Sequence, residues 1–148
     1  MDTNALEAVL AAYCAGPQLV RDALAGLAED GLDLTPDEGG WSIRQVVHHL
    51  VDGDFLWQVG LLAALGSAES FDLRWYWSQP QEAWAQAWEY AGRPVEPALD
   101  FFNASRQRAA ELLRCIPGAL ERQMSVNWPG VGSQALTARE ILEMQTRH

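Results

Sequence analysis

Apolar residues recur every three or four positions along most of the chain, a spacing that places them on one side of an α-helix. Alternation with a period of two, which would indicate strands, is nearly absent. The pattern therefore predicts four main helices separated by segments rich in glycine and proline. We expect these helices over residues 6–27, 43–65, 95–115 and 138–148.

Local signals mark where some of these helices begin or bend. Ser42 with Gln45 and Thr137 with Glu140 both have the spacing of a capping box, in which each residue satisfies a free backbone N–H of the other. Pro17 lies inside the first segment, where it removes one backbone donor. We expect either one helix kinked at Pro17 or two short helices in line.

The connections between the predicted helices differ greatly in length. Residues 67–79 are expected to form a loop, and Pro80 opens a short helical stretch, so the second and third helices are joined by a long crossover. Residues 119–136 are irregular, with a turn at 128–130 that suits a hairpin. The pattern predicts a single all-α domain over residues 1–148, a four-helix bundle with a long crossover.

The last predicted helix is unusually short. It has about 11 residues after its cap, or about 17 Å, and would pack against helices twice as long. It also ends at His148 without a glycine or any other C-cap. We therefore expect the fourth helix to be truncated.

Charge narrows the classes of partner. The chain has 10 basic and 20 acidic side chains and a net charge of −10. Such an acidic chain lacks the basic footprint for a phosphate backbone or an anionic membrane, so we expect no nucleic-acid and no membrane partner. All basic residues are arginine, which excludes lysine chemistry. An acidic start without an apolar leader indicates a cytoplasmic protein, in which Cys14 and Cys115 are free, buried thiols.

Histidine is the most informative residue type. His49 shares a helix face with two glycines, which leave room beside it, and Asp52 lies one turn further on, where a carboxylate can orient an imidazole. His148 lies near the end of the fourth predicted helix. His48 falls on an adjacent face and is expected to point elsewhere.

These histidines leave two interpretations open. Adjacent histidines on a helix are more often one buried and one exposed structural residue. A catalytic zinc site normally has three protein ligands, and no Cys-x-x-Cys or His-Glu-x-x-His motif is present. The residues alone therefore favour a structural role over a metal site.

Tryptophan is the other abundant candidate, with seven residues in the chain. Trp84 and Trp88 lie one helical turn apart, which is more typical of a core than of a ligand platform. Trp75 and Trp77 flank a tyrosine in the predicted loop. We expect that pair to line either the mouth of a pocket or a contact between subunits.

One segment resembles the signature of a known family. It reads Gly-Gly-Trp-Ser over residues 39–42 and Arg-Gln-Val-Val-His-His-Leu-Val-Asp over residues 44–52. The segment is similar to the signature of the DinB/YfiT-like superfamily of small bacterial helical proteins. The resemblance extends over most of the chain, including residues 137–148, and implies a four-helix bundle with a long crossover.

The resemblance also implies a metal site. Many members hold a divalent metal through one histidine on the second helix and a His-x-x-x-His pair on the fourth. By position, His49 and His148 would be metal ligands, and the third ligand would follow four residues after His148, beyond this chain. The implied metal is zinc or nickel, or else iron, with Asp52 as an orienting or acid–base catalytic residue.

Members of known activity use low-molecular-weight thiols such as bacillithiol or mycothiol. The resemblance therefore implies a metal-dependent thiol S-transferase or a related detoxification enzyme, with such a thiol and a small electrophile as its partners. The alternative is a non-enzymatic helical module that binds a small ligand or dimerises and has an incomplete metal site. The tryptophan-rich crossover and the apolar content also predict a homodimer.

Overall fold

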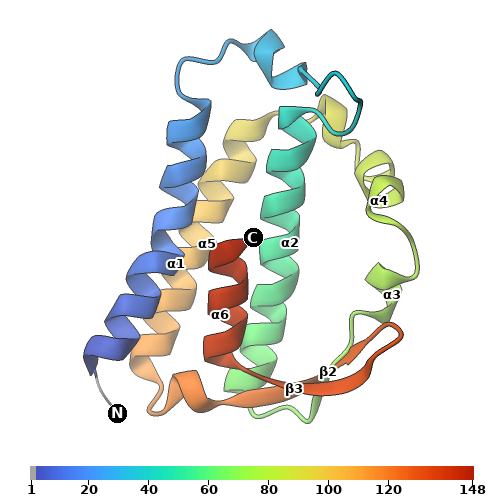
Figure 1. The fold of residues 1–148 in the computed structure, drawn as a ribbon. Coiled ribbons are helices and arrows are strands. Elements are labelled where there is room, and N and C mark those ends of the chain that lie inside the picture. Colours follow the sequence, from blue (N-terminus) through green and yellow to red (C-terminus); the bar gives the residue numbers. More distant parts are fainter. Residues whose placement is uncertain (1–2) are drawn as a thin grey trace.

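The computed structural model describes residues 3–148 and is built around a bundle of helices. Helices α1 and α6 run in one direction, whereas α2 and α5 run in the other, so the connection from α2 to α5 must return along the whole bundle (Figure 1). The four-helix arrangement predicted from the sequence is confirmed. The bundle helices are α1 (Thr3–Leu24), α2 (Ile43–Leu65), α5 (Val95–Cys115) and α6 (Ala138–Arg147).

The helix ends follow the local signals. The Ser42 side chain accepts a hydrogen bond from the Gln45 N–H, and the Gln45 side chain accepts one from the Ser42 N–H. Thr137 and Glu140 make the same reciprocal pair at the start of α6. Such a cap contributes about 1 kcal/mol to helix stability. Pro17 lies inside α1, which is one helix rather than two.

The chain is not purely helical, which corrects the all-α prediction. Strands β2 (Gln123–Trp128) and β3 (Gly132–Thr137) form an antiparallel hairpin, and the short strand β1 (Ser70–Phe71) pairs in parallel with β2. Met124 and Val126 of β2 are buried and alternate with more exposed residues. A period-two pattern only a few residues long is too brief to stand out in the sequence, so β1 in particular was expected to be loop.

The crossover from α2 to α5 is built from short elements that are rich in aromatic residues. These elements are β1, α3 (Arg74–Trp77), α4 (Gln81–Ala87) and the 3₁₀ turn η2 (Tyr90–Gly92). Tyr76 stacks on Trp84 and Trp88, and the Trp84 indole N–H donates to the Tyr76 carbonyl at 2.7 Å. Trp84 and Trp88 are therefore half-buried in an aromatic cluster of the crossover and do not belong to the bundle core that the sequence favoured.

Two hydrophobic clusters fill the bundle. The larger lies at the end that carries the sheet and combines residues of all four bundle helices with β2 and the 3₁₀ turn η3 (Ala119–Glu121). The smaller lies at the other end and combines α2, α5 and the 3₁₀ turn η1 (Glu29–Asp33). We call these regions the sheet end and the open end. Helix α6 stops about halfway along the bundle, so it covers the sheet end alone (Figure 1).

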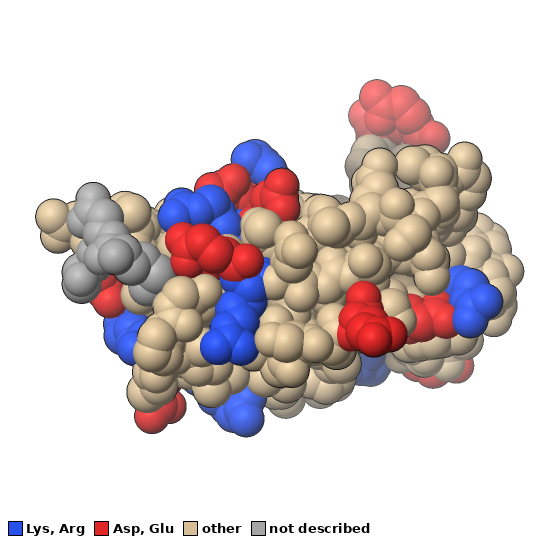
Figure 2. All heavy atoms as spheres, turned by 90° about the horizontal axis from the view of Figure 1, so that it is seen from below, with Lys and Arg blue, Asp and Glu red and all other residues tan. Residues whose placement is uncertain are grey.

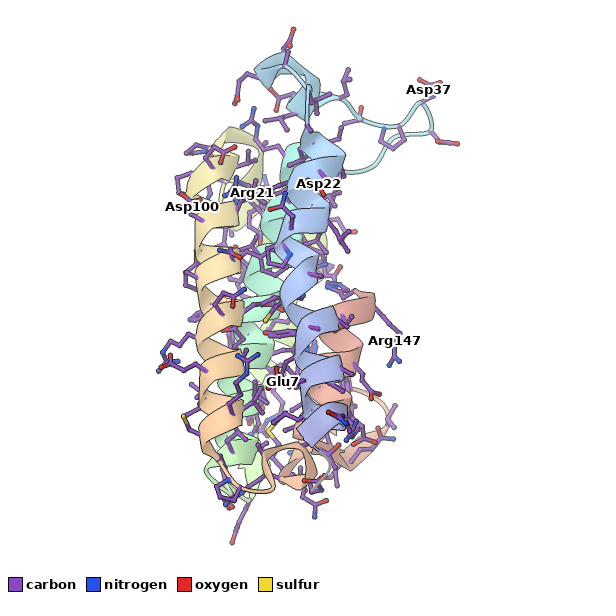
Figure 3. The ribbon with its side chains drawn as sticks, turned by 90° about the vertical axis from the view of Figure 1, so that its left-hand side faces the viewer. Glu7, Arg21, Asp22, Asp37, Asp100 and Arg147 are labelled. Carbon is purple, nitrogen blue, oxygen red and sulfur yellow. The ribbon has the colours of Figure 1, made fainter. Side chains whose placement is uncertain are left out.

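Surface charges pair across helices. Arg21 of α1 reaches Asp100 of α5, with 2.6 Å between guanidinium and carboxylate (Figure 3). Arg114 pairs with Glu7 at 2.8 Å. Seen from the sheet end, arginines lie beside acidic residues, and uncharged residues cover much of the remaining face (Figure 2).

The sequence predicts that both cysteine thiols are free and buried. Cys14 and Cys115 are both free, as predicted, but Cys115 at the last turn of α5 is exposed, so its predicted burial was wrong. Cys14 is half-buried, and burial raises the pKa of its thiol.

None of the helices in the described part of the chain combines the length and hydropathy that a membrane span requires.

Candidate functional site

The structure brings His49 and His148 together, although they lie on different helices. His49 is on the second turn of α2, and His148 directly follows α6. Their ring centroids are 5.4 Å apart, and the ring planes meet edge-on at 67°. The Cε1 atom of His148 lies close to Gly53, where a Cβ atom would already be in contact at 3.7 Å. That distance is an ordinary van der Waals contact, so the end of α6 packs closely against α2 at this position.

The environment of His49 favours its neutral form. Burial lowers the pKa of His49, and the neighbouring His148 lowers it further, whereas the charge of Asp52 acts in the opposite direction. Trp41 packs edge-on against the His49 ring, with 4.8 Å between centroids, and so restrains its orientation. A neutral, oriented imidazole has a free lone pair and is the form that binds metals.

His48 points elsewhere, as expected. It is 1% exposed, and its Nε2 atom lies 3.2 Å from the Arg93 carbonyl, so Nε2 carries the proton. Its ring stacks on Tyr90 at 5.6 Å. Burial lowers the pKa of His48, which keeps the ring neutral and structural.

Asp52 lies one turn from His49, but its carboxylate turns towards the crossover. It faces Arg93 at 3.3 Å, and burial together with the Asp52 charge raises the pKa of the nearby Tyr90 hydroxyl. Asp52 borders a neighbouring hollow with Trp75 and Trp88 and is not among the residues that line the cavity beside the two histidines.

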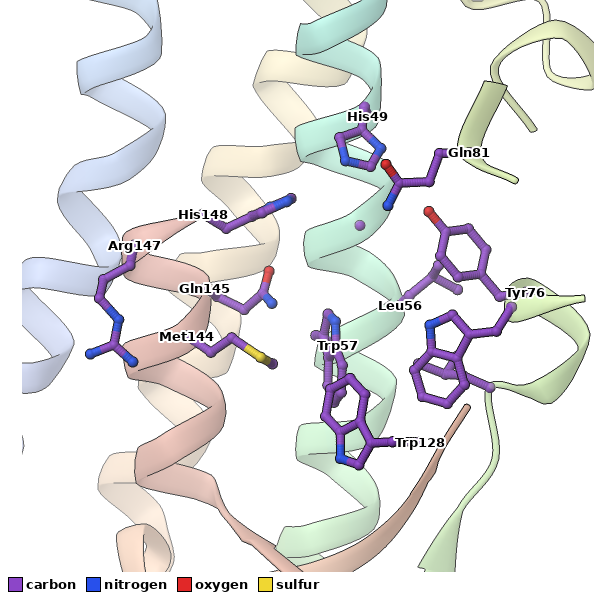
Figure 4. Close-up of a pocket in the computed structure, with 13 residues that line it drawn as sticks. His49, Leu56, Trp57, Tyr76, Gln81, Trp128, Met144, Gln145, Arg147 and His148 are labelled. Atoms are coloured by element: carbon purple, nitrogen blue, oxygen red, sulfur yellow. The ribbon is translucent and has the colours of Figure 1, made fainter. Parts of the chain in front are cut away.

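A cavity of about 360 Å³ opens beside the histidine pair (Figure 4). Its walls are mostly apolar and aromatic, which suits a small organic ligand. Trp77 is part of the wall, so the pocket-mouth interpretation of this residue agrees with its position, whereas Trp75 borders the neighbouring hollow. The lining comes from α2, the crossover, β2 and the C-terminal end of the chain: His49, Gly53, Leu56, Trp57, Leu73, Tyr76, Trp77, Gln81, Trp128, Met144, Gln145, Arg147 and His148.

Two lining residues differ in how they face the cavity. Arg147 points away from His49 and towards solvent (Figure 4). Tyr76 directs its hydroxyl towards Gln81 at the opposite wall from α6 (Figure 4). Burial and the charge of Asp52 raise the pKa of Tyr76, so this hydroxyl remains protonated at neutral pH and can donate a hydrogen bond.

A buried ion pair positions the end of α6, and sequence reasoning missed it. Arg106 of α5 and Asp54 of α2 are 3% and 1% exposed, with 2.8 Å between Nη2 and Oδ1. Arg106 also donates to the carbonyls of Tyr13 and Gln145 at 2.6 and 2.9 Å. One guanidinium thus connects all four bundle helices. Gly16 makes this possible, because a Cβ atom there would collide with the Arg106 guanidinium.

The sequence does contain a signal for this pair. Arg106 follows Phe102 and precedes Ala109 and Leu113 at helical spacing, so it lies on the apolar stripe of its helix. Asp54 lies in the same way on the stripe that contains Val51. Opposite charges on the inward faces of two neighbouring helices indicate a buried ion pair, since an isolated buried charge is too costly.

The two imidazoles meet the first requirement of a metal site. Two rings bound to one zinc ion at about 2.0–2.1 Å and a tetrahedral angle have centres about 5 Å apart, close to the separation seen here. Within residues 3–148, however, no group of three or more histidine, cysteine, aspartate or glutamate side chains is arranged to hold an ion. The described residues therefore offer a metal ion two imidazole ligands, whereas a catalytic zinc site normally has three protein ligands.

The fold and the site together define a class of helical-bundle proteins in which a histidine pair lies beside a cavity. A family model of the DinB superfamily matches residues 12–148. The chain therefore belongs to the DinB superfamily, as its Trp41-to-Asp52 segment indicated.

Relatives with curated descriptions agree. A protein of Oceanobacillus iheyensis, described as a candidate metal-dependent hydrolase, is 31% identical over 107 residues, which cover 72% of this chain and 59% of that protein. A protein of Geobacillus thermodenitrificans with the same description is 31% identical over 109 residues, 70% of this chain and 56% of the relative. The chain thus spans less than two thirds of the length of these relatives.

A solved structure shares the fold. YfiT from Bacillus subtilis, described as a probable metal-dependent hydrolase with an unusual four-helix bundle topology, superposes with a TM-score of 0.79 at 19% identity. The match covers 99% of this chain and 80% of YfiT. At this identity the likeness supports the fold alone.

Proposed function

We propose that this chain contains the cavity and two ligands of a divalent-metal centre, and that the enzyme transfers a low-molecular-weight thiol to a small electrophile. His49 and His148 would hold the ion, and a third imidazole four residues after His148 would complete the set. The observation that carries the proposal is the 5.4 Å separation of the two rings at the wall of a cavity. Zinc or nickel suits imidazole ligands, and iron is also compatible.

The proposal assigns distinct tasks to the chain's own residues. When bound, the ion would lower the pKa of a thiol on its open position and so supply a nucleophile at neutral pH. His49 offers a lone pair because burial keeps its ring neutral, and Trp41 restrains that ring. Leu56 and Trp77, which line the cavity, would shield the reacting groups from water. The Tyr76 hydroxyl offers a proton donor on the opposite wall.

Asp52 takes a narrower role than the sequence suggested. Its carboxylate pairs with Arg93 and is absent from the lining of the histidine cavity, so in this proposal it does not touch substrate. It is a positioning residue, which ties the crossover to α2 next to His49. The charge of Asp52 also partly offsets the effect of burial, which lowers the pKa of His49.

A second candidate reaction uses the same site. The curated relatives are described as candidate metal-dependent hydrolases, which favours activated water instead of a thiol as nucleophile. The two reactions are distinguished by supplying purified protein and Zn²⁺ or Ni²⁺ with either a thiol plus a chloroarene electrophile or an activated ester alone. Thiol conjugation without ester hydrolysis supports the transferase.

Metal binding itself is tested by thermal unfolding. Zn²⁺ or Ni²⁺ should raise the Tm of the chain, because a ligand that binds only the folded state stabilises it. His49→Ala should abolish the shift while retaining helical content. Extending the chain by Ala-Ala-Ala-His should enlarge the shift, whereas an Ala-Ala-Ala-Ala extension should not. No shift with either chain would overturn the proposal and support a non-enzymatic, ligand-binding module.

Assembly is part of the same proposal. Phe55, Trp75 and Phe101 are 47%, 51% and 44% exposed, and Phe55 packs edge-on against Phe101 at 5.4 Å. We propose that a second copy covers this aromatic surface in a homodimer. Light scattering should give twice the mass of 16.4 kDa, and a monomer mass at high concentration would refute it.

A further inference from the structure

A second hollow adjoins the histidine cavity, and the proposed function does not use it. Leu56 borders both spaces. The second hollow has a volume of about 530 Å³, within the range of about 300–1,000 Å³ that small-molecule sites occupy. It lies between α2 and the crossover, which runs alongside α2 (Figure 1). We call it the crossover hollow, and its lining residues are Asp52, Phe55, Leu56, Trp75, Trp88 and Arg93.

Most of the wall of the crossover hollow is aromatic and accessible. Phe55 and Trp75 are 47% and 51% exposed, and Trp88 is half-buried. Both tryptophans are held by a further ring of the crossover. Trp75 packs edge-on against Trp84 with 5.6 Å between centroids, and Trp88 stacks on the same ring at 5.0 Å. The wall therefore offers restrained aromatic faces against which a planar ring can pack.

The polar side chains of the crossover hollow are one base and one acid. Arg93 and Asp52 face each other, and their side chains are 40% and 29% exposed, so a ligand from solvent can reach both. The Nη1 and Oδ2 atoms are 3.3 Å apart, whereas a charge-assisted hydrogen bond is usually about 2.7–2.9 Å long. This is the one hydrogen bond that the Arg93 guanidinium makes within residues 3–148. The pair therefore retains donors and acceptors for a ligand.

The backbone that carries this pair is firmly held. The Arg93 carbonyl accepts hydrogen bonds from His48 Nε2 and Arg44 Nη1, both at 3.2 Å, and both donors belong to buried side chains of α2. The guanidinium also lies over the Tyr90 ring, 5.7 Å from its centroid. Asp52 belongs to α2 itself. The donors and acceptors are thus placed before a ligand arrives, which reduces the cost of binding.

This arrangement determines the polar groups of a suitable ligand. A guanidinium only donates hydrogen bonds, and a carboxylate only accepts them. A ligand that satisfies both must present a C=O beside an N–H, as a cyclic amide (lactam) does on adjacent ring atoms. Charged ligands suit the hollow less well. An anion at Arg93 would be repelled by Asp52 and by the net charge of −10, and a cation at Asp52 would be repelled by Arg93.

We propose that the crossover hollow binds a neutral, planar heteroaromatic lactam. The ring packs against the aromatic wall, its C=O accepts a hydrogen bond from Arg93, and its N–H donates one to Asp52. Neither contact involves the histidine pair or a metal ion. This site therefore does not depend on the proposed function, and each can fail without the other.

The test compares two probes of the same size and shape. 2-Quinolone carries the lactam, and coumarin replaces its N–H with a ring oxygen while keeping the carbonyl. Binding is followed in EDTA by NMR of the tryptophan indole N–H groups. The resonances of Trp75 and Trp88 should shift, whereas those of Trp57 and Trp128 in the histidine cavity should not. We expect 2-quinolone to bind about tenfold to a hundredfold more tightly, the range for one hydrogen bond to a charged group.

Variants assign the two polar contacts. Asp52→Ala should bring the ratio of the two affinities close to one, because the N–H loses its acceptor. Arg93→Met keeps the apolar stem and should weaken both probes by a similar factor, because both carbonyls lose the same donor. Arg21→Met removes an arginine of comparable exposure, 30%, that pairs with α5 away from the hollow. It is the matched control and should leave both affinities unchanged.

The outcomes decide the proposal with or without a metal at the histidines. A preference for the lactam that disappears in Asp52→Ala supports it. Absence of 2-quinolone binding, equal affinities for the two probes in the wild type, or shifts confined to Trp57 and Trp128 would overturn it. Tighter binding of 1-methylquinolinium or 2-naphthoate would also overturn it, since the hollow would then select a charged ligand.

Discussion

The two ends of the bundle use similar sequence patterns and reach different degrees of closure. At the sheet end, α6 packs between α1 and α2, and Leu10 of α1 is 0% exposed. At the open end nothing in residues 3–148 takes the place of α6, and Leu19 of the same helix is 65% exposed. There Leu19, Leu34 and Val46 border an apolar groove of about 660 Å³ between α1 and α2.

The difference is one of length. Helix α1 has 22 residues, or about 33 Å, whereas α6 has 10 residues, or about 15 Å. At the open end, the turn η1 covers part of the core in place of α6. Arg44, 5% exposed, pairs with Glu29 and Asp33 at 2.8 and 2.7 Å and so holds η1 over the end of the smaller core. The comparison shows that an apolar stripe is buried only where a neighbouring element is long enough to cover it.

The boundary between the two ends is the buried Arg106–Asp54 pair, and breaking it should have the largest effect. Arg106→Met leaves Asp54 as an unpaired buried charge and should lower the free energy of unfolding by about 3–5 kcal/mol. Arg44→Met should cost clearly less, since its partners remain in water. Urea denaturation measures both. Equal losses would mean that the two arginines are equivalent, contrary to their burial.

Truncating one leucine at each end sharpens the comparison within a single helix. Leu10→Ala removes side-chain atoms from the larger core and should cost about 2–5 kcal/mol. Leu19→Ala removes atoms that already face solvent and should change stability by less than about 0.5 kcal/mol. A large loss for Leu19→Ala would show that the groove is covered in solution, by a second copy or by another segment.

The smallest expected effect is a pH dependence where α6 meets α2. Burial holds the pKa of His49 below its usual value of about 6.5, so the unfolded chain takes up the proton at a higher pH than the folded chain does. Stability of the metal-free protein should therefore fall as the pH drops from 7 through 6.5 towards the folded pKa, and then level off. His49→Asn should weaken this dependence. Stability that rises over the same interval would contradict the assignment.

Local features were predictable because they depend on neighbours in the sequence. The boundaries of α2 and α5, the capping boxes at Ser42 and Thr137, and the turn near Trp128 all follow from spacing over a few residues. The joint position of His49 and His148 was anticipated differently, through the family resemblance, because no local rule relates two helices this far apart in the chain. The distance between their two rings depends on how α6 packs against α2.

The sequence by itself determined the helices, their caps, the lysine-free acidic surface and the family. The tertiary structure alone decided that Arg106 and Asp54 meet, that Asp52 turns towards Arg93, that Cys115 is exposed and that Gln145 lines the cavity. The physical reason is the distance along the sequence over which each kind of contact acts. Helix formation is settled by contacts three or four residues apart, whereas burial, pairing and cavity shape depend on which distant helix lies opposite and on how far it extends.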